Sequence, residues 1–144
     1  MIYTDTSCLL KVLRPEALSE SVWRAIEGES SVVISALTEL ETLVQLKAAW
    51  TGGSLTRTQW RQAEAKVGHL RNQPPFEFRT LASQVFQVAL RQHRNSGGLH
   101  CRSLDGLHLA AMEELKISRL MTHDESQAKA ALAAGFIVVR PGRD

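Results

Sequence analysis

Short apolar segments alternate along this chain with longer segments in which apolar residues recur at helical spacing. We predict a strand at each of the short segments, which are residues 1–4, 31–34, 76–78, 119–121 and 136–139. Helices are predicted between them, over residues 6–13, 16–27, about 35–50, 55–71, 81–94, 104–115 and 125–134. Strands that alternate with helices in this way are joined by right-handed crossovers and pair in parallel. The pattern therefore predicts an α/β fold.

The longest helical stretch lies between the second and third predicted strands. Thr-Gly-Gly-Ser at residues 51–54 interrupts it, and Pro74-Pro75 closes it, so we predict a helical hairpin at about residues 37–71. Trp50 and Trp60 lie on this hairpin. They either close it against itself or anchor a protein partner, because aromatic side chains bind with little loss of entropy.

Length and composition narrow the class of protein. A chain of 144 residues is long enough to bury one hydrophobic core, so we expect residues 1–144 to form a single domain. The net charge is only +2, and the sequence has no dense basic runs like those of a disordered nucleic-acid-binding tail. Its two cysteines match no zinc spacing, and no segment approaches the ~20 apolar residues of a membrane span. We therefore expect a cytoplasmic protein without a membrane anchor.

Four acidic residues are predicted to lie at one edge of the sheet. Parallel strands end at a common edge, where ligands bind in α/β proteins. Asp5 follows the first strand, Glu41 lies in the helix after the second, and Asp124 follows the fourth. Asp105 opens the helix before the fourth strand, so its place depends on how residues 99–103 return the chain to that edge.

Carboxylates gathered this closely repel one another unless a cation neutralises them, and Mg²⁺ or Mn²⁺ is the natural occupant. A metal ion can generate hydroxide from bound water and neutralise a leaving oxygen, so such a site suits phosphodiester hydrolysis. A structural interpretation competes with this one. Asp5 and Asp124 stand where helix caps are expected, Glu41 has capping-box spacing from Thr38, and the helix dipole favours Asp105 in a first turn. Position alone leaves both interpretations open.

Four short motifs provide more specific evidence. They are Ile-Tyr-Thr-Asp-Thr-Ser at residues 2–7, Ser-Ala-Leu-Thr at 35–38 leading to Glu41, Leu-Asp-Gly-Leu-His-Leu-Ala at 104–110, and Thr-His-Asp at 122–124 followed by Ala128 and Ala131. In this order and spacing the chain resembles the PIN-domain family and, within it, the VapC-type toxins of prokaryotic toxin–antitoxin pairs. Any one motif is weak, but four in order along essentially the whole chain argue against a chance match.

The resemblance implies a three-layer α/β/α sandwich around a central, mainly parallel sheet of about five strands. It also implies an endoribonuclease that depends on one or two Mg²⁺ or Mn²⁺ ions, a small cognate antitoxin as partner, and a homodimer. The resemblance also assigns site residues: Asp5, Glu41, Asp105 and Asp124 match the family's four acidic positions. The hydroxyl of Thr6 or Ser7 matches the group that supports them near the metal.

Some neighbouring residues are left outside the predicted catalytic set. Glu39 is the rival for the second acid, but Glu41 stands six residues beyond Ser35, where the family's Ser-Ala-Leu-Thr pattern places its acid. His108 lies one turn beyond Asp105 and could orient it, yet a histidine in a buried helix is more often a core residue.

Three further residues carry weaker expectations. We predict that His123 is a solvent-exposed loop residue and that Cys8 packs as a small hydrophobic side chain. Among the dispersed arginines, which are candidates for RNA phosphate contacts, Arg102 is of most interest because it lies one turn before Asp105.

Other functions fit the sequence less well. Enzymes with an aspartyl nucleophile after the first strand need a second Asp two positions on, where this chain has Ser7. A receiver domain needs an acid at the end of the middle strand, where residues 78–80 are Phe-Arg-Thr. The more serious alternative is a non-catalytic PIN-like RNA- or protein-binding module whose acids only cap helices.

Overall fold

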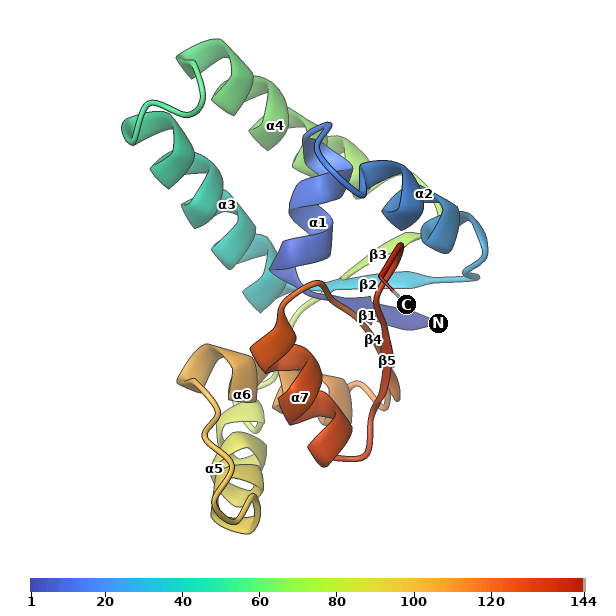
Figure 1. The fold of residues 1–144 in the computed structure, drawn as a ribbon, viewed down its shortest axis with the longest axis vertical. Helices are drawn as coiled ribbons and strands as arrows, with labels where there is room; N and C mark the ends of the chain where they lie inside the picture. Colours follow the sequence, from blue (N-terminus) through green and yellow to red (C-terminus); the bar gives the residue numbers. More distant parts are fainter. Residues whose placement is uncertain (144) are drawn as a thin grey trace.

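The computed structural model describes residues 1–143 and places a five-stranded sheet at the centre of the chain (Figure 1). The strands lie in the order β3-β2-β1-β4-β5, and every neighbouring pair is parallel. Their bounds are β1 Ile2–Thr4, β2 Val32–Ser35, β3 Phe76–Arg79, β4 Arg119–Met121 and β5 Ile137–Val139. This arrangement confirms the predicted α/β fold with a parallel sheet.

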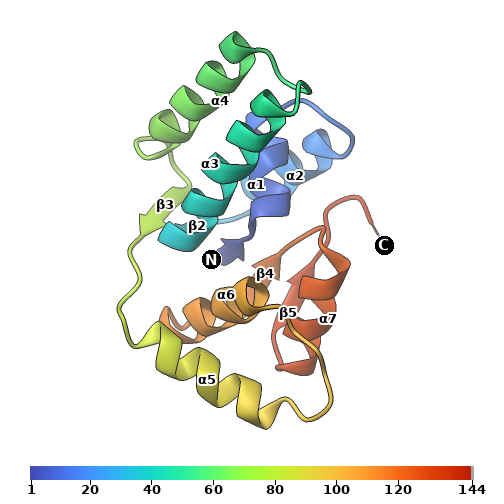
Figure 2. The same cartoon turned by 90° about the vertical axis from the view of Figure 1, so that its left-hand side faces the viewer.

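Within residues 1–143, seven helices cover the two faces of the sheet. The first face carries α1 Thr6–Leu13, α2 Ser19–Glu27, α3 Ala36–Thr51 and α4 Arg57–Leu70. The opposite face carries α5 Val85–Asn95, α6 Ser103–Glu114 and α7 Glu125–Ala133, and the view turned by 90° shows the same separation (Figure 2). The three layers agree with the predicted sandwich.

Alternation of side chains along the strands divides the core in two. Ile2 and Ile34 pack with α1 to α4 in one buried cluster, whereas Tyr3, Val33 and Leu120 pack with α5 to α7 in the other. Successive strand residues point to opposite faces, so a strand buried on both faces must be apolar throughout. This requirement explains why β1 and β2 are buried along their whole length and mostly apolar, whereas the edge strand β3 alternates as Phe-Glu-Phe-Arg.

The order of the strands creates a crevice beside β1. The chain moves outward from β1 to β2 and β3, and then crosses through α5 and α6 to β4 on the other side of β1. Loops therefore leave β1 and β4 in opposite directions at their carboxyl ends, and ligands bind at such reversal points. The ends of β1, β2 and β4 form the floor of the site described below.

Two predicted helices begin later than their hydrophobic patterns indicated. The second starts at Ser19 rather than at residue 16, because the Ser19 hydroxyl accepts a hydrogen bond from Glu16 N and donates one to Arg14 O, which holds this segment in a turn. The helix predicted from residue 81 starts at Val85. There Val85 N donates to Ala82 O, a tight turn that precedes the helix.

The helices α3 and α4 pack against each other and extend beyond the sheet (Figure 1). The indole rings of Trp50 and Trp60 stack between them, with centroids 4.2 Å apart and planes 3° from parallel. Thr56 begins α4 with a reciprocal capping box to Gln59. The two tryptophans thus face each other and close the helix pair. Within residues 1–143, no helix has the length and apolar character needed to cross a membrane.

Candidate active site

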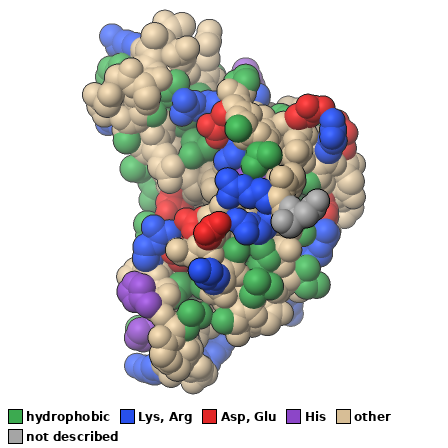
Figure 3. All heavy atoms as spheres, viewed as in Figure 1, with side chains coloured by type: hydrophobic (Ala, Val, Ile, Leu, Met, Phe, Trp, Pro, Cys, Tyr) green, Lys and Arg blue, Asp and Glu red, His purple; other side chains and the backbone are tan. Residues whose placement is uncertain are grey.

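A cleft of about 390 Å³ opens at the carboxyl ends of β1, β2 and β4. Its walls come from the first turns of α1, α6 and α7 and from the second turn of α3. The space-filling view shows acidic and basic side chains next to each other at the waist between the two helical layers (Figure 3). The lining residues on which the site depends are Asp5, Glu41, Asp105 and Asp124, with Thr6, Ser7, Arg102, His108 and Gln127.

Asp5 lies at the floor of the cleft and is buried. One carboxylate oxygen, Oδ1, accepts hydrogen bonds from Ser7 Oγ (2.7 Å) and from Cys8 N (3.2 Å), and so caps α1. The other oxygen, Oδ2, accepts from the hydroxyl of Thr122 at the end of β4. Burial raises the pKa of Asp5, and these hydrogen bonds offset the effect only in part. A cation beside this carboxylate would favour its ionised form.

Glu41 reaches the cleft from the second turn of α3. Its Oε2 accepts a hydrogen bond from Thr6 Oγ1 (3.0 Å) and is also bonded to His108 Nε2. The hydrogen bond from His108 is the main cause that lowers the pKa of Glu41, and it outweighs the opposing effect of burial. Glu41 is therefore held as a carboxylate in one orientation.

His108 is part of a buried hydrogen-bonded network that the sequence reasoning missed. Its Nδ1 lies 2.7 Å from the hydroxyl of Tyr3, which in turn lies 2.7 Å from Ser35 Oγ. A carboxylate can only accept hydrogen bonds, so Nε2 donates to Glu41, and in the neutral ring Nδ1 accepts from Tyr3. His108 stands three positions after Asp105 on α6, which was the available signal. Burial alone did not reveal that its partner is an acid of the site.

Asp105 and Asp124 share one guanidinium group. Arg102 Nε donates to Asp105 Oδ2 (2.7 Å), and Arg102 Nη2 lies 3.4 Å from Asp105 Oδ1 and 3.0 Å from Asp124 Oδ2. The other oxygen of Asp124 accepts from Gln127 N and caps α7. Burial acts to raise the pKa of Asp124, but the hydrogen bonds from Gln127 and Arg102 lower it overall.

The side chain of Gln127 supports Asp105 from behind. Its Nε2 donates to the backbone carbonyl of Asp105 (3.3 Å). Asp124 and Gln127 have the sequence spacing of a capping box, yet Gln127 uses its amide to connect α7 to α6. Asp105 lines the cleft, so the loop over residues 99–103 does return the chain to this edge of the sheet.

Glu39, the rival for the second acid, lies outside the cleft. It is paired with Arg71, the residue that follows α4 (2.5 Å), whereas Glu41 lines the cleft itself. The hydroxyl of Thr6 donates to Glu41 and that of Ser7 donates to Asp5. The two hydroxyls support different acids.

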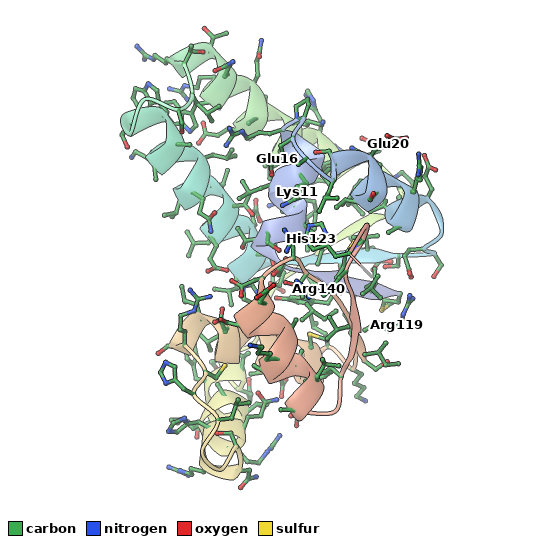
Figure 4. The ribbon with its side chains drawn as sticks, in the orientation of Figure 1. Lys11, Glu16, Glu20, Arg119, His123 and Arg140 are labelled. Atoms are coloured by element: carbon green, nitrogen blue, oxygen red, sulfur yellow. The ribbon has the colours of Figure 1, made fainter. Side chains whose placement is uncertain are left out.

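The prediction for His123 was wrong, because this side chain is buried. His123 Nε2 is 2.7 Å from Pro141 O, and its backbone N donates to Ser7 Oγ (2.8 Å). Figure 4 shows it between α1 and the segment that follows β5, near Lys11 and Arg140. Burial lowers the pKa of His123. The short segment after β5 folds back over the loop, which sequence periodicity could not indicate. Cys8 is buried in the core, as predicted.

The donor atoms fit a hard divalent cation. All four acids supply carboxylate oxygens, which Mg²⁺ and Mn²⁺ prefer, and the buried charge of Asp5 needs a positive partner. Within residues 1–143, no three Asp, Glu, His or Cys side chains are grouped closely enough to hold an ion as they stand. Arg102 instead supplies the positive charge between Asp105 and Asp124.

Comparisons with known proteins identify the family of this chain. The PIN domain family model matches residues 2–132. Ribonuclease VapC46 of Mycobacterium tuberculosis is 29% identical over 145 residues, which cover 97% of each chain. The structure of VapC20 from the same species, described as a toxin that cleaves the sarcin-ricin loop, superposes with a TM-score of 0.73 at 20% identity and covers 98% of this chain and all of that one. A toxin–antitoxin complex from Klebsiella pneumoniae gives a TM-score of 0.69 at 14% identity over the full length of both chains. The chain therefore belongs to the PIN-domain family.

Proposed function

We propose that this chain is a divalent-metal-dependent endoribonuclease and the toxin of a toxin–antitoxin pair. The observation that carries the proposal is the meeting of four acids from separate segments of the chain in one cleft. The similarity to VapC46 and VapC20 supports RNA as the substrate. Hydrolysis of a phosphodiester bond is the reaction that this set of acids favours.

In this proposal Asp5, Glu41, Asp105 and Asp124 hold one or two Mg²⁺ or Mn²⁺ ions. Such an ion, when bound, lowers the pKa of water to supply a nucleophile and neutralises charge on the leaving oxygen. The chain's own contribution is to fix the acids in place before RNA arrives. This support matters, because mutation of the groups that hold metal ligands in place typically lowers metal affinity or activity about 10-fold to 100-fold.

Hydrogen bonds behind the acids provide that support. Thr6 and His108 fix the carboxylate of Glu41, and Ser7 and Thr122 fix that of Asp5. Thr6, His108 and Thr122 come from segments distant in sequence from the acids they hold, whereas Ser7 lies in the turn directly after Asp5. The folded sheet and its helices thereby set the orientation of the acids.

The alternative is a non-catalytic binding module whose acids only cap helices. Asp5 and Asp124 do cap α1 and α7, but each uses one oxygen for the cap and directs the other to a side chain of the site. In the part of the chain that the structure describes, neither Glu41 nor Asp105 accepts a backbone N–H through its carboxylate. A capping role leaves these two acids unexplained.

Exposed apolar surface supports the proposal of protein partners. Leu40 and Val44 are exposed on α3, and Phe86 and Leu90 are exposed on α5 beside a mostly apolar hollow of about 830 Å³. Contiguous exposed apolar surface marks protein interfaces in many proteins. We propose a cognate antitoxin and a second copy of this chain as the partners, with the cytoplasm as the compartment.

Two glutamates on one helix provide the sharpest test of the activity. Purified protein is incubated with a mixture of tRNA and ribosomal RNA in Mn²⁺, and the cleaved ends are mapped; EDTA should abolish cleavage. Glu41→Gln should lower the cleavage rate about 100-fold or more, because a metal-binding acid supports several kcal/mol of transition-state stabilisation. Glu39→Gln, the matched control, should cleave like the parent. Equal rates for the two variants, or cleavage that survives EDTA, would contradict the proposal.

A further inference from the structure

The guanidinium of Arg102 occupies the gap between two acids of the site. It engages both oxygens of Asp105, one through Nε and one through Nη2, and the same Nη2 reaches Asp124. Two carboxylates that converge on one nitrogen repel each other unless a cation lies between them. In this arrangement that cation is a side chain of the protein itself.

Arg102 can leave this position at little structural cost. Its side chain is 61% exposed, compared with 13% for Asp105 and 35% for Asp124, so it approaches the acids from the solvent side of the cleft. It stands at the N-cap position of α6, but its side chain makes no cap hydrogen bond there. An ion pair whose cation is largely exposed is weaker than a fully buried one, and rotation of the long side chain breaks it.

A metal ion and this guanidinium need the same oxygens. Mg²⁺ binds oxygen at about 2.0–2.1 Å, and a cation so placed would repel a positive group that shares its ligands. Asp105 has no carboxylate oxygen outside the contacts of Arg102. Either cation can neutralise the pair of acids, but both cannot do so at the same time.

We propose that Arg102 is an internal competitor for the metal position, neutralising Asp105 and Asp124 in the metal-free protein and leaving them when a divalent ion binds. The inference rests on the proposed metal-dependent function. It gives Asp105 and Asp124 a positive partner whenever no divalent ion is bound. It also makes metal affinity depend on a residue that is not a ligand.

Binding of MnCl₂ alone, measured by isothermal titration calorimetry at one fixed salt concentration, tests the competition. Arg102→Met should bind Mn²⁺ about three- to tenfold more tightly than the parent, because the ion no longer has to displace the guanidinium from the two acids. Arg102→Lys keeps the charge but loses the two-pronged contact, so its affinity should lie between the two. Arg94→Met, at the exposed end of α5, changes the net charge equally and should bind like the parent.

Nuclear magnetic resonance provides a readout that does not depend on affinity. The Nε–H of Arg102 donates to Asp105 and should give a protected signal in the metal-free protein, assigned by its absence from Arg102→Lys. Titration with diamagnetic MgCl₂ should shift this signal or broaden it as the guanidinium is released. The Nε–H signal of Arg79, which is paired with Glu77 on β3, should stay unchanged.

The outcomes separate this inference from the proposed function. Unchanged or weaker Mn²⁺ binding by Arg102→Met, or an Arg102 signal that Mg²⁺ leaves in place, overturns the competition even if the parent cleaves RNA. Absence of both Mn²⁺ binding and RNA cleavage in the parent would instead overturn the proposed function, and the inference with it. Tighter binding by Arg102→Met with an unchanged Arg94 control supports the competition.

Discussion

Asp5 provides the clearest distinction between an acid that serves the site and one that serves only the fold. Its carboxylate caps α1 through Cys8 N and accepts hydrogen bonds from two buried or half-buried hydroxyls, those of Ser7 and Thr122. Asparagine has the same shape and caps helices about as well as aspartate. Alanine removes the cap and all the hydrogen bonds. The two substitutions therefore separate the charge of Asp5 from its structural contacts.

The structure sets the expected sizes in metal-free protein. Asp5→Ala should lower the free energy of unfolding by about 2–4 kcal/mol, with about 1 kcal/mol for the lost cap and about 1 kcal/mol or more for each hydroxyl left without its acceptor. Asp5→Asn should stay within about 1 kcal/mol of the parent, because Asn keeps the cap and the Thr122 hydroxyl can turn to accept from the new amide.

The pH dependence of stability has a sign that follows from the raised pKa of Asp5. Folding favours the protonated form of Asp5. Its contribution to the free energy of unfolding therefore declines as the pH rises from the unfolded pKa of about 3.9 through the higher folded value. Above the folded pKa, the protein bears the full cost of burying the ionised carboxylate. Asp5→Asn removes this cost, so the variant should gain stability relative to the parent as the pH is raised through that window.

Urea unfolding in EDTA, followed by circular dichroism, measures these differences, and repetition with Mn²⁺ completes the test. A ligand at 100 times its dissociation constant stabilises the folded state by about 2.7 kcal/mol, so the parent should gain stability in Mn²⁺. Asp5→Asn should lose most of that gain although its metal-free stability is normal. If Asp5→Asn is as unstable in EDTA as Asp5→Ala, or gains as much from Mn²⁺ as the parent, the carboxylate is a helix cap and our reasoning is refuted.

Two further predictions concern the support of the site and the core. His108→Ala should raise the pKa of Glu41, because the hydrogen bond from His108 is the main cause that lowers it, and should slow cleavage about 10-fold to 100-fold; carbon-13 NMR of the Glu41 carboxyl in EDTA measures the first effect, and an unchanged pKa would contradict it. Leu46→Ala should lower the free energy of unfolding by about 2–5 kcal/mol in urea titrations, since Leu46 is fully buried. Leu40→Ala on the same helix is the control, because Leu40 is 60% exposed and its loss should change stability by less than about 0.5 kcal/mol.

The positions of the acids followed from the sequence to the extent that strand order was predictable. Asp5 and Asp124 come directly after strands, and parallel strands share an edge, so their proximity needed no coordinates. The choice of Glu41 over Glu39 came from the family's spacing and agrees with the cleft. Asp105 depended on a loop of irregular conformation, and only the folded chain placed it.

The partners of buried polar groups could not be predicted in the same way. Periodicity indicated that His108 faces the interior, but nothing local indicated that Glu41 of α3 and Tyr3 of β1 would meet it there. His123 was predicted to be exposed, yet residues after β5 cover it. In both cases the contacts join segments far apart in the chain.

The sequence by itself determined the alternation of strands and helices, the parallel sheet and the set of acids at its edge, because hydrophobic spacing and strand ends are local properties of the chain. Tertiary structure alone decided which distant group contacts each acid: Thr122 contacts Asp5, His108 contacts Glu41, and Arg102 contacts Asp124. The physical reason is that electrostatic and hydrogen-bonded pairing depends on distance in space. Distance between segments is fixed only when the sheet and both helical layers have packed.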